Sequence, residues 1–198
     1  MGDAASRLVT IFRRAPRDHV AARFNGMEAR LLRDLAYQIE ELVGEDAADD
    51  ETQVPDSPGL PDDSALEDAL GLTQDAGPPD DPALARLLPD AYRDDPDASS
   101  EFRRYTERDL RAGKVDAART ILATLPEDGG RVSLSAEEAH VWLRALNDIR
   151  LALAVRLGIA EEMPDDLDQM SPDDPRYAAF AVYDWLTGTQ DSLVQALS

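Results

Sequence analysis

The sequence predicts a mainly α-helical protein, a bundle of about five to six helices with a small N-terminal β-hairpin of two or three strands. Two patterns lead to this fold class. Residues 136–157 carry leucine and isoleucine at helical spacing, which is typical of a helix that buries one face. Residues 7–13 and 18–24 are short, rich in β-branched and aromatic residues, and separated by a turn that contains Pro16. That arrangement indicates a hairpin.

The first helix is expected to follow the hairpin directly. Asn25 is a candidate N-cap and Glu28 stands three residues later, the capping-box spacing in which two orphan amides find acceptors. The helix should end near Val43, with Gly44 as its stop. Its apolar face consists of Leu31, Leu35, Ile39 and Leu42.

The middle of the chain contains three further helical patterns. Residues 82–88 form a short helix that Pro89 ends, because proline cannot continue a helix. Residues 98–112 and 114–125 form either two helices around Gly113 or one kinked helix.

The strongest helix signal follows a short strand. Residues 131–134 favour a third strand added to the hairpin, and residues 136–157 form the next helix. Ser135 is its candidate N-cap, Glu138 completes a capping box, and Gly158 is the C-terminal stop.

The last predicted helix spans residues 174–197, with Asp174 as its cap. The whole chain, residues 1–198, is predicted to be a single domain. An acidic, proline-rich, mobile insertion over residues 45–80 interrupts it, and a short helix over residues 64–71 falls inside this insertion.

The charge of the chain is concentrated in that acidic region. The 198 residues have a formal net charge of −21, and residues 45–97 hold 17 acids, two bases and eight of the 13 prolines. Acid and proline with little apolar content cannot bury enough surface to become ordered. The segment is therefore interpreted either as a solvated loop or as a docking segment for a basic partner.

The N-terminal region has the opposite charge. The arginines that could contact a nucleic acid or another partner are Arg7, Arg13, Arg14, Arg17 and Arg23. Basic residues on a short ribbon can touch phosphate. The alternative is a locally balanced surface, because the large negative net charge repels DNA.

The composition excludes several kinds of chemistry. The chain has no cysteine, so disulfides, cysteine zinc sites, iron–sulfur clusters and thiol nucleophiles are all excluded. His19 and His140 stand far apart in the sequence and outside any metal motif, and no phosphate-binding glycine motif is present. We therefore expect no catalytic residue, no metal and no cofactor. The apolar stretches are far shorter than the roughly 20 residues that span a bilayer, which predicts no membrane association.

One polar group stands on the best apolar helix. Arg150 falls nearly in line with its leucines, and Asn147 and Asp148 lie beside it. A buried cation should be paired, and the predicted partners are Glu107 and Asp184. The group is interpreted either as a structural ion-pair network or as a ligand pocket that Tyr183 also lines.

Four blocks of the sequence resemble, in order, a family of actinobacterial proteins of about this length, the DUF2017 family. The blocks are DPALARLLPDAYRDD, FRRYTERDLRAGKVDAARTILATLPE, GGRVSLSAEEAHVWLRALNDIRLALAVRLGI and YDWLTGTQDSLVQAL. The resemblance implies a cytoplasmic protein whose genes lie near those of a Clp-protease adaptor and of cysteine biosynthesis. Some members are described as oxidative-stress transcription regulators that work with an alternative sigma factor and sense oxidation through a cysteine pair. Because this chain has no cysteine, that sensing mechanism is excluded here.

The expected function is therefore that of a non-enzymatic, cytoplasmic regulatory or adaptor protein. Its expected partner is RNA polymerase or a sigma factor, with any DNA contact indirect or confined to the N-terminal arginines. Two alternatives stay open, namely an adaptor that binds Clp-protease components and a small-molecule-binding module around Arg150.

Overall fold

The computed structural model describes residues 8–48, 78–92, 94–159, 174 and 176–198. These residues form three strands and five helices. In chain order they are β1 (Arg13–Ala15), β2 (His19–Phe24), α1 (Gly26–Ala48), α3 (Pro82–Leu87), α4 (Pro96–Thr124), β3 (Gly130–Leu134), α5 (Ala136–Leu157) and α6 (Tyr177–Leu197). The mainly α-helical architecture with a small N-terminal sheet confirms the predicted fold class.

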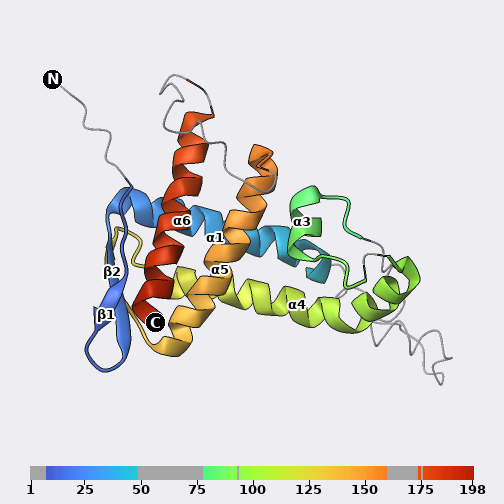
Figure 1. The fold of residues 1–198 in the computed structure, drawn as a ribbon, viewed down its shortest axis with the longest axis horizontal. Helices are drawn as coiled ribbons and strands as arrows, with labels where there is room; N and C mark the ends of the chain where they lie inside the picture. Colours follow the sequence, from blue (N-terminus) through green and yellow to red (C-terminus); the bar gives the residue numbers. More distant parts are fainter. Residues whose placement is uncertain (1–7, 49–77, 93, 160–173, 175) are drawn as a thin grey trace, which may run out of the picture.

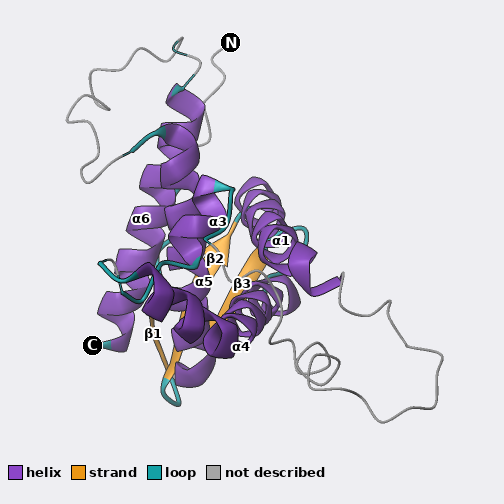
Figure 2. Ribbon diagram, turned by 90° about the vertical axis from the view of Figure 1, so that its right-hand side faces the viewer, coloured by secondary structure: helices purple, strands orange, loops and turns teal. Residues whose placement is uncertain are grey.

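The helices surround α5, and the sheet closes one end of the bundle. Helix α5 packs against α3, α4 and α6, and α1 packs along α4. In Figure 2, α5 lies between α6 on one side and α1 and α4 on the other. Figure 1 shows the sheet at one end of the long axis of the molecule, with α3 and the first turns of α4 towards the opposite end.

The sheet has the strand order β1-β2-β3, with both pairs antiparallel. Its inner face buries Val20, Ala22 and Phe24 of β2 against the helices. The Phe24 ring lies 5.9 Å from that of Trp142, a fully buried residue of α5. Aromatic pairs at such separations stabilise a core beyond their buried area.

Strand β1 is shorter and later than the predicted strand over residues 7–13. Only residues 13–15 pair with β2. The preceding residues bond to helices instead, because the backbone N–H of Val9 donates to Glu28 Oε1 at 2.7 Å and that of Phe12 donates to Ser192 Oγ at 2.9 Å. The tertiary structure thus supplies acceptors that a hairpin partner would otherwise provide.

Helix α1 begins with the predicted capping box at Asn25 and Glu28, but its predicted end was wrong. The helix continues through Gly44 to Ala48. A glycine inside a helix costs only about 1 kcal/mol, and Val43 beside it is fully buried, which anchors this part of α1. Residues 45–48 of the predicted insertion thus belong to α1. The predicted helix over residues 64–71 and residues 49–77 of the insertion lie outside the described residues.

Helix α4 is one continuous helix rather than two. Gly113 lies inside it with open space around its Cα. The helix begins at Pro96, earlier than predicted, because the Asp95 side chain accepts the backbone N–H of Ala98 at 3.0 Å. Asp95 is thus the N-cap, and proline suits the first helical turn.

Helix α5 follows the prediction closely. The Ser135–Glu138 capping box is formed, and Gly158 ends the helix with a left-handed φ of 68°. Helix α6 differs because it begins at Tyr177. Asp174 accepts the backbone N–H of Arg176 at 2.8 Å, before the helix, and is not its N-cap. No helix within the described residues combines the length and the apolar character needed to cross a bilayer.

Candidate functional site

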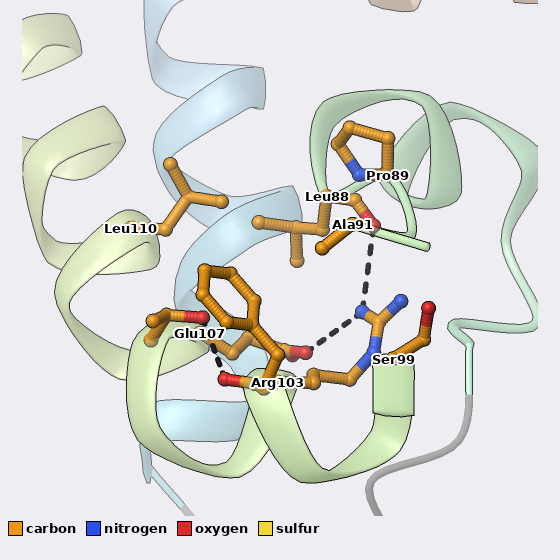
Figure 3. A pocket seen from close by; sticks show the side chains of 9 residues that line it. Leu88, Pro89, Ala91, Ser99, Arg103, Glu107 and Leu110 are labelled. Carbon is orange, nitrogen blue, oxygen red and sulfur yellow. Dashed lines mark hydrogen bonds and ion pairs between the residues drawn. The ribbon is translucent and has the colours of Figure 1, made fainter. Parts of the chain in front are cut away.

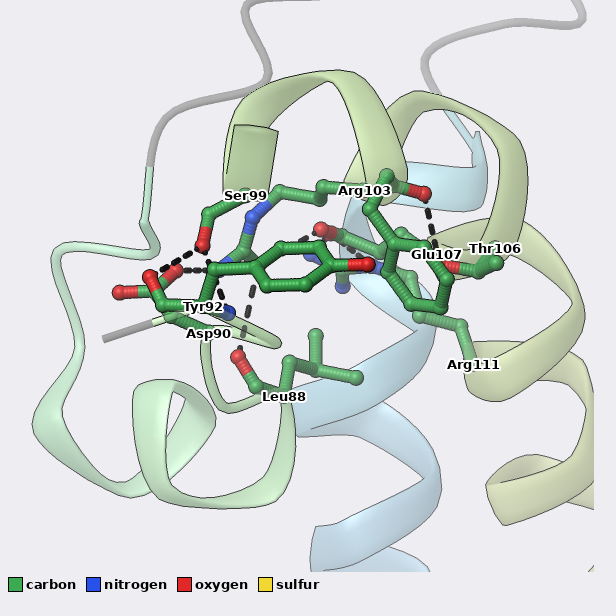
Figure 4. A network of polar contacts seen from close by, with 9 residues as sticks. Leu88, Asp90, Tyr92, Ser99, Arg103, Thr106, Glu107 and Arg111 are labelled. Carbon is green, nitrogen blue, oxygen red and sulfur yellow. Dashed lines mark hydrogen bonds and ion pairs between the residues drawn. The ribbon is translucent and has the colours of Figure 1, made fainter. Parts of the chain in front are cut away.

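A buried arginine organises the surface where α4 meets the connection from α3. Arg103 is only 8% exposed. Its guanidinium bonds to Glu107 Oε2 at 2.8 Å, to Asp90 Oδ1 at 2.6 Å and to the Leu88 carbonyl at 3.4 Å (Figure 4). Desolvation works to lower the pKa of Arg103, but hydrogen bonds and charges from the two carboxylates outweigh it, so the pKa is raised. Arg103 therefore stays charged and fixes the geometry around it.

The same network joins α4 to α1. Glu107 Oε1 lies 2.7 Å from Arg111 Nη2, and Arg111 Nη1 donates to the Val43 carbonyl at 3.0 Å. Ser99 adds a second clamp, because its hydroxyl donates to the Tyr92 carbonyl and accepts the Tyr92 N–H. Paired charges of this kind hold a surface rigid.

Exposed apolar side chains cover this rigid base. We call Tyr92, Phe102, Tyr105 and Leu110 the α4 apolar surface, and their exposed fractions are 51%, 47%, 67% and 44%. The Tyr92 and Phe102 rings meet edge to face at 6.1 Å. Phe102 and Leu110 line one hollow, so Tyr92, Phe102 and Leu110 are exposed together, and Tyr105 follows Phe102 by three residues on α4. Contiguous exposed apolar surface marks interaction sites.

The α4 apolar surface contains a shallow hollow of about 50 Å³ (Figure 3). Leu88, Phe102, Thr106 and Leu110 are among the residues that line it. Pockets for drug-sized ligands have volumes of roughly 300–1,000 Å³. The hollow therefore suits one inserted side chain of a protein partner better than a separate small molecule.

The sequence prediction found only part of this site. Glu107 was predicted as a partner of Arg150, and Arg103 was missed. The spacing of Arg103, Glu107 and Arg111 is i, i+4, i+8, a charge pattern that places all three on one helix face. That pattern is visible in the sequence, but the burial of Arg103 depends on the α3–α4 connection that covers it.

The predicted partners of Arg150 were wrong. Arg150 Nη1 donates to Gln190 Oε1 at 2.6 Å, and the guanidinium lies 5.3 Å from the centre of the Tyr183 ring. Tyr183 and Gln190 are seven residues apart and share one face of α6. Asp184 is turned about 100° away from that face and is exposed. Glu107 belongs to the Arg103 network instead.

Asn147 and Asp148, which were predicted to join Arg150 in one network, do not share its contacts. Asn147 is exposed. The Asp148 side chain is 7% exposed and forms an ion pair at 2.8 Å with Lys114 of α4. Burial raises the pKa of Asp148, while the hydrogen bond and charge of Lys114 oppose that rise. The predicted network is thus two separate contacts, which join α5 to α6 and α5 to α4.

Four of the five predicted arginines lie on the sheet or in its β1–β2 turn. Arg7 lies outside the described residues. Arg14 contributes to the structure, because its Nε donates to the Ala196 carbonyl at the end of α6 at 3.2 Å. Arg13, Arg17 and Arg23 are exposed.

The sheet adds an arginine that the prediction missed. Arg131 of β3 lies directly opposite Arg23 of β2 in the strand register. We call Arg13, Arg17, Arg23 and Arg131 the basic sheet face. Among the described residues, no carboxylate forms an ion pair with these four arginines. The predicted strand over residues 131–134 was the available signal, but its register was not readable from the sequence.

Comparisons with known proteins identify relatives with a regulatory name. The family model described as "Domain of unknown function (DUF2017)" matches residues 9–197. Proteins of Mycobacterium tuberculosis (strain ATCC 25618 / H37Rv) and Mycobacterium bovis (strain ATCC BAA-935 / AF2122/97), both named "Oxidative stress regulator AosR", are each 40% identical over 146 residues. Those matches cover 67% of this chain and 66% of each relative. A protein of Mycobacterium leprae (strain TN) is 39% identical over 132 residues, which is 60% of this chain and 59% of that protein.

The chain thus matches just under two thirds of the length of these curated relatives. No solved structure matches the chain.

Proposed function

The chain belongs to the DUF2017 family, and from this premise we propose that it is a non-enzymatic regulatory protein that binds the transcription machinery. The regulator name carried by relatives of about 40% identity supports a role in the response to oxidative stress. The proposed partner is RNA polymerase or one of its sigma factors. The proposed location is the cytoplasm, where that machinery works.

The observation that carries the proposal is the α4 apolar surface. Protein interfaces draw most of their binding energy from a few aromatic or aliphatic anchors around a well-packed centre. Phe102 and Tyr105 are exposed anchors on a helix that the Arg103 network holds rigid. Because a rigid surface loses little conformational entropy on binding, this arrangement favours docking of a protein.

The absence of cysteine limits the ways in which such a regulator could respond to oxidative stress. A chain without cysteine cannot change its affinity through a thiol switch. We therefore expect that treating this chain alone with a thiol oxidant or a thiol reductant leaves its binding to the transcription machinery unchanged. In this proposal the oxidation signal is sensed by the partner.

The test measures binding of the purified protein to the purified RNA polymerase core, to individual sigma factors and to Clp-protease components from its host. Phe102→Ser combined with Tyr105→Ser removes two anchors, while Tyr37→Ser removes an aromatic side chain of similar exposure from α1. Circular dichroism checks that each variant is folded. We expect polymerase or a sigma factor to bind the wild type and the Tyr37 variant, with at least tenfold weaker binding to the double variant.

Two results would contradict the proposal. One is polymerase binding that the double variant leaves unchanged, since the α4 apolar surface would then not be the docking site. The other is binding of Clp components without any binding of polymerase or sigma factors. That second result would favour the proteostasis adaptor.

A further inference from the structure

The outer face of the sheet has a composition unlike the rest of this acidic chain. Residues that alternate with the buried side chains of β2 and β3 point outwards, and they include Arg23 and Arg131. Arg13 pairs with Ala21 on the same face, and Arg17 lies in the β1–β2 turn. We propose that the basic sheet face binds the phosphate backbone of duplex DNA.

Two like charges face each other across the sheet without a described carboxylate between them. Like charges directly opposite each other on neighbouring strands are destabilising, and Arg23 faces Arg131 in this way. The chain has 41 acids and 20 bases, so acids are abundant. Still, no described carboxylate pairs with either arginine. An anionic ligand between the two guanidinium groups would turn the repulsion into attraction.

The residues of the basic sheet face favour phosphate as the bound anion. Arginine binds phosphate through two parallel hydrogen bonds, and phosphate contacts need only positive charge and donors. The other outward residues of this face, His19, Ala21 and Ser133, are small or polar. The paired strands thus place no large apolar anchor on this face, although a protein partner would require one.

The same residues favour duplex DNA over a single strand. Proteins that bind single-stranded nucleic acid stack its bases on aromatic side chains. The outward positions of the paired strands carry no aromatic ring other than the His19 imidazole, whose Nδ1 lies 2.8 Å from the Arg17 carbonyl oxygen. A double strand presents its phosphates without any need for stacking.

The position of the basic sheet face reduces the repulsion between DNA and the net charge of −21. The sheet lies at one end of the long axis, and the acidic start of α4 lies towards the other (Figure 1). Charges farther apart than about 8–10 Å are largely screened at physiological salt. The DNA would therefore meet the sheet end of the molecule, and binding would be weak, independent of base sequence and strongly dependent on salt.

The inference rests on the proposed function for its biological role, because DNA bound at the sheet end leaves the α4 apolar surface free for a protein. The binding itself is measured separately. The probe is a fluorescently labelled duplex of about 20 base pairs, and its anisotropy is recorded against protein concentration from 25 to 200 mM salt. Four phosphate contacts predict a slope of about −3.6 in log K against log salt concentration.

Matched variants distinguish binding at the basic sheet face from a general effect of the net charge of the protein. Arg23→Gln with Arg131→Gln removes two arginines from the face, and Arg104→Gln with Arg108→Gln removes two exposed arginines of α4. Both variants change the net charge equally. We expect the first variant to lose about two units of the slope and about tenfold or more in affinity at 50 mM salt, and the second to stay near wild type. Replacing the same two sheet residues by lysine should preserve the slope.

Several outcomes would overturn the inference. They are no binding of the duplex at 25 mM salt, an equal loss in both glutamine variants, tighter binding of a single strand, or displacement by polyglutamate at the same charge concentration. The last result would identify an acidic protein segment as the ligand. The glutamine sheet variant should still bind the partner of the α4 apolar surface, and the Phe102/Tyr105 variant should still bind DNA. The two proposals therefore fail independently.

Discussion

Replacing Lys114 by methionine should destabilise the protein by about 3 kcal/mol at neutral pH. Lys114 is the only lysine of the chain, and its Nζ lies 2.8 Å from Asp148 Oδ1. The two side chains are 15% and 7% exposed. At an effective dielectric constant of about 20, their attraction is about 6 kcal/mol before desolvation is counted. Breaking a buried pair costs about 3–5 kcal/mol, and the residual exposure favours the lower end.

The destabilisation should depend on pH in a defined direction. Burial raises the pKa of Asp148, and Lys114 opposes this rise, so the variant should raise the pKa further. A carboxyl group with a raised pKa holds its proton more tightly in the folded state than in the unfolded state. Stability is therefore lost as pH rises from the unfolded pKa through the folded pKa. The difference from wild type should shrink in acid, where Asp148 of the variant is protonated.

Urea unfolding followed by tryptophan fluorescence measures this difference, since Trp142 and Trp185 are both buried. With a slope of about 2 kcal/mol per M, the midpoint should fall by about 1.5 M at neutral pH. Lys114→Met combined with Asp148→Leu should restore stability to within about 1 kcal/mol of wild type, because a buried pair and an apolar pair are often equivalent.

Arg119→Met is the matched control for the buried pair. Its ion pair with Glu40 has a similar length of 2.7 Å, but Arg119 is 63% exposed. Removing it should cost less than about 1 kcal/mol. A Lys114→Met effect below about 1 kcal/mol, or one that is equal at acidic and neutral pH, would show that solvent already screens the buried pair and would refute the reasoning.

Three further predictions concern stability and are checked by thermal or urea unfolding. Ser135→Ala removes one half of the α5 capping box and should cost about 1 kcal/mol; an unchanged midpoint would mean that water replaces the cap. Gly129→Ala should cost more than about 2 kcal/mol of stability, because φ is 79° and a Cβ would lie 2.6 Å from the Asn25 backbone. Gly113→Ala should instead stabilise the protein by up to about 1 kcal/mol, because a Cβ there meets open space on α4. Equal effects of the two substitutions would contradict this expectation. Trp142→Phe loses the 2.9 Å hydrogen bond from Nε1 to Thr124 Oγ1 and part of a fully buried ring. It should therefore lower the free energy of unfolding by about 2–3 kcal/mol. A loss under about 1 kcal/mol would indicate that the core collapses around the gap.

The fold was largely predictable because its helices carry local signals. The α5 cap, stripe and stop all lie within the helix or next to it, and the structure reproduces them. The errors occurred where a distant element changed a local preference. Val43 is buried against other elements, and α1 continues through Gly44. Likewise, acceptors on α1 and α6 take the backbone N–H groups that were assigned to the first strand.

The candidate sites were predictable only in part, because each depends on a contact between distant segments. The sequence contains the i, i+4, i+8 pattern of the Arg103 network, but Asp90 and the α3–α4 connection bury Arg103. The sequence also places Arg150 on an apolar stripe. The rotation of α6 then selects Gln190 and Tyr183 as its neighbours and leaves Asp184 exposed.

The sequence by itself determined the helical class, the capped α5 helix, the charge of −21 and the exclusion of thiol chemistry. These properties depend on composition or on interactions within a few residues of each other. Only the tertiary structure decided that Arg23 lies opposite Arg131 and that Lys114 pairs with Asp148. Strand register and helix rotation are set by the packing of whole elements, and a shift of one residue would turn either arginine to the other face of the sheet.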